Sequence, residues 1–265
     1  MAISSFIPKV WSKKILDGLN RALILGALCG RDYEDDVAEY GDTVHIGTLS
    51  DATVRPYTRG QAINAAEPVN GTDKTLTIDH SVYAHVSIDD ITAAQARADL
   101  LEAVTRMVGR RLAEDTEGYL EEVIIEEAGV TGSIDASGDL AQQVASIKDN
   151  MDSMSAPRVG RSLVVPPTME SALMGNAMFQ AMATAPTPKA AELGALYRFA
   201  GFDIYKSSDL TDQVFALTPG AVQLAQKIVT EIYRPELALA TCVKAYSLAG
   251  AKVVIPGAVA CYFIS

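Results

Sequence analysis

The stretch "DKTLTIDHSVYAHVSIDDI", residues 73–91, alternates apolar and polar side chains without a break from residue 76 to residue 88. A period of two is typical of a β-strand that buries one face and exposes the other. We therefore predict one continuous strand in this stretch. The alternation places His80 on the apolar face of that strand and His85 on the polar face.

The same stretch holds two of the three histidines and four aspartates, so a metal site or an acid–base site has to be considered. At about 3.3 Å per residue, His80 and His85 would lie roughly 16 Å apart on opposite faces. The ligands of one zinc ion lie ~2 Å from the metal, so these two imidazoles cannot share an ion. We expect a structural histidine at position 80 and no metal site.

A second strand is predicted upstream in "GDTVHIGTL", residues 41–49, where Val44 and Ile46 alternate with polar neighbours. The intervening residues 50–72 contain proline and glycine breakers. Residues 41–88 are therefore interpreted as one long two-stranded ribbon with an extended tip. Because an isolated two-stranded hairpin is marginal in water, either the tip is mobile in the free chain or it lies on a partner.

The next segment, residues 89–129, has the period of a long helix with Asp89 or Asp90 as its N-cap. Unbroken, this helix would extend roughly 57 Å, and Gly109 and Gly118 are the places where it could be interrupted. Its predicted apolar face comprises Ile91, Ala94, Ala98, Leu101, Val104, Val108, Leu112, Tyr119 and Val123.

Acidic side chains dominate this helix. Residues 89–127 contain eleven acids and four arginines and so carry −7 of the chain's net charge of −11. The pairs Glu121-Glu122 and Glu126-Glu127 could suggest a divalent-ion site, but adjacent helical residues diverge by about 100°. A solvated acidic face is the better interpretation.

From residue 139 onward, helix and strand patterns alternate. Asp139 is a predicted N-cap, followed by the stripe Leu140, Val144, Ile147 and Met151. Beyond it we predict a buried strand in 161–167, a helix in 168–174, a loop over 175–194, strands in 202–207 and 213–219, a short helix over 220–227, and a strand-rich end with turns at Gly250 and Pro256-Gly257. Met169, Met174, Met178 and Met182 are interpreted as core or loop packing.

Composition indicates a globular chain, since 49% of its 265 residues are hydrophobic. The net charge of −11 argues against a surface built to bind phosphates. Cys29, Cys242 and Cys261 fit no metal template and are interpreted as reduced thiols. Neither a membrane-spanning run nor a signal peptide is recognisable, so we expect a soluble intracellular protein with no membrane contact.

The N-terminal residues 1–31 are basic, with five lysines and arginines against Asp17, and residues 32–39 are acidic. This asymmetry could mark a membrane or partner contact. It fits equally well an ordinary solvated helix with Trp11, Ile15, Leu19 and Leu23 on one face.

Catalytic signatures are missing from the sequence. We find neither type of glycine-rich phosphate loop, and none of the motifs H-E-x-x-H, C-x-x-C, G-x-S-x-G and S-x-x-K. Asp203 or Asp209 beside Ser207 and Ser208 could act as an acid–base group, but surface turns are the better interpretation. We therefore expect no catalytic residue and no cofactor.

The order of these parts resembles the major capsid proteins of tailed bacteriophages, the shell subunits of the Hong Kong 97-type fold. The resemblance rests on "FIPKVWSKKILDGL" (6–19), "RDYEDDVAEYGDTVHI" (31–46), "TLTIDHSVYAHVSIDDITAAQARADLLE" (75–102) and "KVVIPGAVACYFI" (252–264). It implies an α+β fold with five parts: an N-terminal arm (1–40), an extended β-hairpin loop (41–88), a spine helix (89–129) that opens a peripheral domain (89–138), an axial domain (139–230) with an axis loop near 183–192, and C-terminal strands completing both domains (231–265).

The resemblance also implies a non-enzymatic subunit that assembles with copies of itself, as pentamers and hexamers, into an icosahedral virion shell around double-stranded DNA. Assembly in the host cytoplasm, a separate scaffolding protein, a portal, a possible decoration protein and only non-specific contact with DNA are expected. Two alternatives stay open: a bacterial nanocompartment (encapsulin-like) shell, and a small soluble hydrolase or binding protein with a dimerisation arm. By position and side-chain type, the expected inter-subunit contacts are Trp11, Lys13, Lys14, Arg55, Tyr57 and Arg59.

Overall fold

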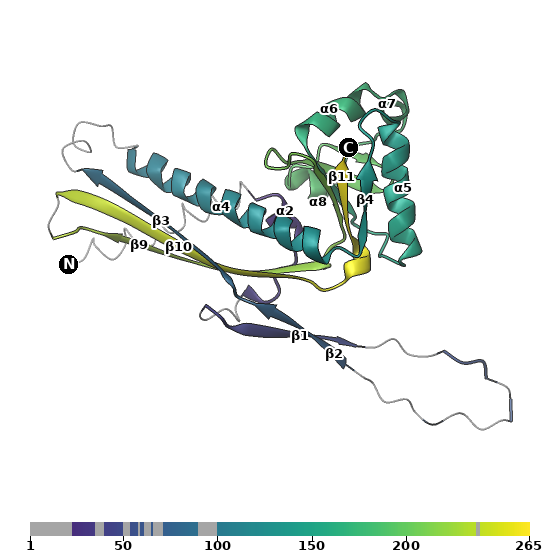
Figure 1. Ribbon diagram of the computed structural model, residues 1–265, viewed down its shortest axis with the longest axis horizontal. Helices are drawn as coiled ribbons and strands as arrows, with labels where there is room; N and C mark the ends of the chain where they lie inside the picture. The colour runs from purple at the N-terminus through teal and green to yellow at the C-terminus, as the bar shows by residue number, and fades with distance from the viewer. Residues whose placement is uncertain are drawn as a thin grey trace.

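The structure is a computed structural model that describes residues 23–34, 40–49, 54–57, 59–60, 65, 71–89, 100–236 and 239–265. Figure 1 shows an elongated molecule in which a long helix and long strands extend to one side of an α/β body and a thin ribbon lies below it. The strands of the described residues form a six-stranded sheet, a three-stranded sheet and a two-stranded ribbon.

The body is built on the six-stranded sheet, whose order is β4-β11-β8-β5-β7-β6. Its strands are β4 (Val130–Ile134), β5 (Ser162–Val165), β6 (Tyr197–Phe199), β7 (Phe202–Lys206), β8 (Gln213–Leu217) and β11 (Val259–Ile264), which follows the 3-10 helix η2 (Pro256–Ala258). β11 runs parallel to β4 and antiparallel to β8. Around this sheet lie α5 (Leu140–Ser153), α6 (Pro167–Gly175), α7 (Ala177–Met182) and α8 (Pro188–Glu192) (Figure 1).

Several local predictions for the body are confirmed. The Asp139 carboxylate accepts the backbone N–H groups of Ala141 and Gln142 and so caps α5. The predicted stripe of that helix is buried, and β5 is buried along its whole length, as its apolar run indicates. α6, β7 and β8 also form where their patterns predict them.

Three other local predictions are wrong. Residues 175–194 are not a loop, because Asn176 caps α7 and a second short helix, α8, follows. Residues 220–227 are not helical; most of them belong to β9 (Val222–Tyr233), which pairs along its whole length with β10 (Ala240–Val253). Gly250 is not a turn residue but lies inside β10. In the last two cases long-range pairing overrides the local pattern.

The three-stranded sheet has the order β3-β10-β9, where β3 is His80–Asp89. Its covered face packs against the long helix α4 (Leu100–Glu127) (Figure 1). The shared cluster consists of Leu23, Val108, Leu112, Ala113, Val243 and Ala245, with Val82, Ala84, Val86, Ile228 and Ile232 at its margin.

α4 connects this cluster with the core of the body. Its first half contributes Val108 and Leu112 to the three-stranded sheet, and its second half contributes Leu120 and Ile124 to the large core. The helix is continuous through Gly109 and Gly118, whereas residues 90–99, which include Ile91, Ala94 and Ala98, lie outside the described residues. Within the described part of the chain, no helix is long and apolar enough to cross a membrane.

The prediction of one continuous strand over 76–88 is wrong. The chain leaves the ribbon strand β2 (Gly71–Thr77) at Ile78 and enters β3 at His80, so the stretch divides between two sheets. β1 (Thr43–Leu49) pairs with β2 alone, and β3 pairs with β10. The alternation continues across the division because both sheets bury side chains of the same parity, among them Leu76 in β2 and Ile88 in β3.

Candidate inter-subunit surfaces

The ribbon exposes most of the side chains that the structure describes in β1 and β2. β1 and β2 pair from Thr43 opposite Thr77 to Leu49 opposite Gly71. At the base of the ribbon, Val44, Ile46, Leu76 and Ile78 form a small cluster with Ala225, and Tyr33, Leu248 and Val254 pack against it. Beyond that base the ribbon projects away from the rest of the molecule (Figure 1).

The expected contact residues near the tip are all on the surface. Tyr57 is 68% exposed, the neighbouring Val54 is 94% exposed, and Arg55 and Arg59 are also exposed. Val54 and Tyr57 are therefore available for contact with a partner. Trp11, Lys13 and Lys14, expected in the N-terminal arm, lie outside the described residues.

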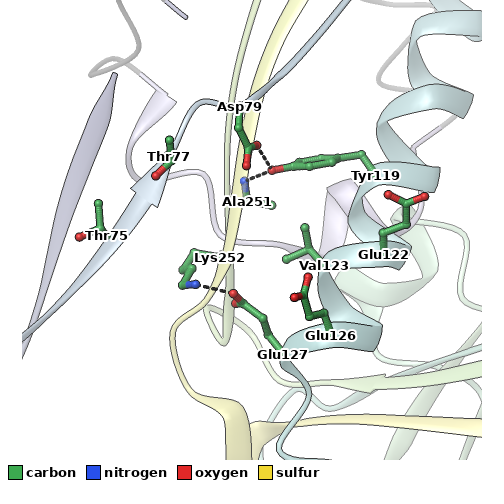
Figure 2. Close-up of a pocket in the computed structure, with 10 residues that line it drawn as sticks. All are labelled: Thr75, Thr77, Asp79, Tyr119, Glu122, Val123, Glu126, Glu127, Ala251 and Lys252. Atoms are coloured by element: carbon green, nitrogen blue, oxygen red, sulfur yellow. Dashed lines mark hydrogen bonds and ion pairs between the residues drawn. The ribbon is translucent and has the colours of Figure 1, made fainter. Parts of the chain in front are cut away.

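An acidic pocket of about 230 Å³ lies where the ribbon, α4 and β10 meet (Figure 2). Tyr119 donates its hydroxyl proton to Asp79 at 2.8 Å and accepts the N–H of Ala251 at 3.1 Å. Burial, followed by the hydrogen bond to Asp79, raises the pKa of Tyr119 well above its usual value. The phenol therefore stays protonated, and it fastens the β2–β3 junction to both α4 and β10.

On the other side of this pocket, Glu127 forms an ion pair with Lys252 and accepts the N–H of Val253 at 3.0 Å. The interpretation of the Glu126-Glu127 pair as a solvated face is therefore wrong for Glu127, whose carboxylate fixes the end of α4 to β10. Glu122 and Glu126 line the rim of the pocket (Figure 2). These hydrogen bonds and this ion pair join the walls of the pocket to each other, so the groups that form them have a structural role.

The histidines have separate structural partners. His80, half-buried, lies 2.6 Å from the Asp115 carboxylate and stacks on Tyr119 with ring centroids 4.4 Å apart. His85 is on the exposed face of the sheet and bonds to the Tyr233 hydroxyl at 2.9 Å. The predicted opposite orientation of the two rings and the structural role of His80 are confirmed. Among the described residues, no cluster of His, Cys, Asp and Glu is arranged to hold a metal ion.

A larger pocket of about 790 Å³ lies between residues 27–32, α8 and one end of the strands β5, β7 and β8. Asp203 is one of its lining residues and accepts the N–H and hydroxyl of Thr187 at 3.1 and 3.0 Å. It is buried within β7, so its interpretation as a surface turn residue is wrong. Cys29 lines the pocket too, and burial, followed by the nearby charge of Glu117, raises the pKa of its thiol to about 12. A thiol held protonated is a poor nucleophile. Asp209 donates its N–H to the Ser207 hydroxyl, as in a turn.

No protein-family model and no curated protein matches the sequence. Solved structures do match. A chain from Mycobacterium phage Che8 aligns with a TM-score of 0.67 at 25% identity over 89% of both chains. A chain from the capsid of the cyanophage P-SCSP1u aligns with a TM-score of 0.68 at 16% identity, over 89% of this chain and 86% of its own length.

The chain has the Hong Kong 97-type fold of the tailed-phage major capsid proteins. The expected α+β fold class is thereby confirmed. A virus-like particle from Pyrococcus furiosus also shares the fold, with a TM-score of 0.65 at 12% identity, over 97% of this chain and 99% of its own. Two of these three structures are described as a capsid or a virus-like particle, and the alternatives are not favoured.

Besides the ribbon, two other areas of the described surface expose apolar side chains. On the uncovered face of the three-stranded sheet, Tyr83 lies directly opposite Tyr246, and the two are 76% and 36% exposed. On α6 and α7, Met174, Met178 and Met182 are also exposed, so the interpretation of these three methionines as core or loop packing is wrong, whereas Met169 is buried as expected.

Glu117, a buried acid that was not predicted from the sequence, binds the backbone of residues 24–26. Glu117 in α4 is 1% exposed, and its carboxylate accepts the N–H groups of Ile24, Leu25 and Gly26, each at 2.9 Å. Burial, followed by the charge of Asp209, raises its pKa, although the three N–H groups act in the opposite direction. A signal was available, because Glu117 continues the helical row of the buried Ala113, Leu120 and Ile124.

Proposed function

We propose that this chain is the structural subunit of an icosahedral phage shell that encloses double-stranded DNA. The single observation that carries the proposal is the projecting ribbon, a two-stranded element whose only described hydrophobic support lies at its base. Two-stranded hairpins are marginal in water, so the distal part needs contacts from outside its own subunit. A neighbouring copy in a closed symmetric shell supplies them.

The expected domain organisation becomes part of this proposal, with changes suggested by the strand pairing. The ribbon β1–β2 corresponds to the extended loop, and β3 joins β9 and β10 in the peripheral domain together with the spine helix α4. The axial domain then comprises the six-stranded sheet with α5 to α8, and it recruits β4 and β11 from outside residues 139–230. The exposed methionines of α6 and α7 fit contacts around an axis of symmetry.

The proposed partners follow from the shell. Copies of the chain form pentamers and hexamers in the host cytoplasm, with a separate scaffolding protein, a portal and, in some shells, a decoration protein. DNA is enclosed without specific binding, since a chain with a net charge of −11 favours no phosphate-binding surface. The subunit itself is non-enzymatic and uses no cofactor.

The proposal is tested by replacing residues 50–70 with Asn-Gly. Leu49 and Gly71 are register partners, so a two-residue turn can close the shortened ribbon. The variant should fold and melt like the parent chain, but electron microscopy should show that it forms no closed shells. Normal shells from the variant would contradict the role of the ribbon.

A finer test replaces Tyr57 by Ala, with Tyr40→Ala as the matched control, because Tyr40 is a similarly exposed tyrosine (61%) near the base of the ribbon. Only Tyr57→Ala should lower the yield of shells.

The contents of the particles distinguish the phage shell from the nanocompartment. Both variants are expressed alone and together with the neighbouring genes. Particles that contain nuclease-protected DNA support the phage shell, whereas particles filled with a protein cargo would support the nanocompartment.

A further inference from the structure

The segment that carries the N-terminal arm is attached to the body at two points. At one point, Glu117 binds the three consecutive N–H groups of Ile24, Leu25 and Gly26. At the other, Gly30 pairs with β9, donating its N–H to Val222 at 2.8 Å and accepting from Leu224 at 2.9 Å. The short helix α2 (Leu25–Leu28) lies between these two points.

The first of these attachments depends on a single side chain. Glu117 projects from the middle of α4, a rigid helix packed against both cores. Three N–H groups that converge on one buried carboxylate make charge-assisted hydrogen bonds, which are roughly twice as strong as neutral ones. Gly26 lies against Leu23, and any larger residue there would crowd the Leu23 side chain. These three hydrogen bonds hold the backbone of residues 24–26 against α4.

We infer that Glu117 is the positioning residue of the N-terminal arm: its carboxylate fixes the arm root, residues 23–26, to the spine helix and so sets the direction in which the preceding residues leave the subunit. This inference rests on the proposed shell function, because a direction matters only if the arm must reach a neighbouring copy. Glu117 is buried, so it acts through the arm root and not by direct contact with another subunit.

The root is the right place for such control. Leu23 is the first described residue and is buried in the cluster between α4 and the three-stranded sheet. A change of the backbone conformation at this point would therefore change the direction in which the chain enters this cluster. The weak contacts between subunits that repeat around a shell form only when the arm reaches its binding site on the neighbouring subunit. An arm that leaves the subunit in the wrong direction therefore does not form them.

The test compares Glu117→Asp, Glu117→Gln and Glu117→Ala with Glu126→Gln, an exposed acid on the same helix. The Gln side chain presents a donor to one of the N–H groups, and the Asp side chain keeps the charge but is one methylene too short. Hydrogen exchange of the amides of residues 24–26 is measured on the unassembled full-length chain. Shell yield is counted by electron microscopy.

We expect exchange at these amides to accelerate by about tenfold or more in Glu117→Gln, because a hydrogen bond to a charged group has been lost. Glu117→Ala should exceed it, Glu117→Asp should fall between it and the parent, and Glu126→Gln should match the parent. Amides of β5 and β8 should stay protected in every variant, and shell yield should fall in the same order as protection at the root is lost.

Two results would overturn the inference: unchanged exchange at residues 24–26 in Glu117→Gln, or faster exchange with the shell yield of the control. If Glu117→Gln and Glu117→Ala fail to fold, Glu117→Asp decides by the same two readouts. A parent chain that forms no shells under any condition would contradict the proposed function, while the exchange data would still show whether Glu117 fixes the root.

Discussion

Gly250 of β10 lies directly against the carbonyl oxygen of Thr77, at the point where the chain passes from the ribbon into β3. A Cβ atom at position 250 would overlap that oxygen and would crowd the side chains of Leu76 and Ile78. Because of this close approach, the chain can pass from β2 to β3 while both sheets bury the side chains of the same parity. The glycine is required by this crossing and not by a turn.

Gly250→Ala should therefore destabilise the subunit by about 1–3 kcal/mol, because the overlap is with backbone and cannot be relieved by a side-chain rotation. Urea unfolding of the unassembled chain measures the change. Gly118→Ala is the matched control: it lies in α4 with open space around it, and it should stabilise the chain by about 0.5–1 kcal/mol. Equal changes in the free energy of unfolding for the two substitutions would contradict the close approach of Gly250 to Thr77.

Glu121 should make stability depend on pH. Burial, followed by the charges of Glu117, Asp209 and Glu122, raises its pKa from 4.5 to about 7. Between these values the folded chain binds a proton that the unfolded chain does not, so stability increases as pH falls through this range and levels off below it. Glu121→Gln should raise the melting temperature above pH 7 by a few degrees and change it little below pH 4.5. A shift of equal size at both ends would exclude titration of Glu121 as the cause.

Asp139→Ala should destabilise the body by about 1 kcal/mol or more, since the carboxylate caps α5. The same oxygen also accepts a hydrogen bond from the Asn176 side chain at 2.9 Å, which connects the starts of α5 and α7. Asp149→Ala, at an exposed position on the same helix, should have almost no effect. Thermal unfolding followed by circular dichroism compares the two variants, and similar losses would argue against the cap.

Met178→Glu should block shell formation without lowering the melting temperature, because the side chain is 42% exposed in the free subunit and we expect a neighbour to cover it. Met178→Leu conserves volume and apolar character and should assemble normally. Electron microscopy and analytical ultracentrifugation distinguish shells from free subunits. Shells of normal yield from Met178→Glu would show that this surface faces solvent.

How much the sequence could predict depended on the range of the interactions involved. The cap at Asp139 and the stripe that follows it depend on neighbours three or four residues away, so α5 was predictable. β9 was not, because Val222, Leu224 and the residues around them take their conformation from β10 and from Gly30. The division between β2 and β3 left no local mark, since Leu76 and Ile88 share one parity.

The candidate surfaces show the same difference between short-range and long-range interactions. The exposed tip around Tyr57 was predictable from its breakers, because a segment that cannot bury itself must stay outside the core. Glu117 lies on the apolar row of its helix, yet only the fold shows that three N–H groups from residues 24–26 meet it. The exposure of Met178 could not be read from its residue type, since methionine fits cores and interfaces alike.

The place of β11 in the body sheet has a consequence for how the subunit is made. This strand, residues 259–264, fills the gap between β4 and β8, which are translated much earlier. β3 must likewise wait for β10. The subunit therefore cannot complete its fold until residue 264 has left the ribosome. Truncated translation products should not be incorporated into the growing particle and should be degraded by proteases.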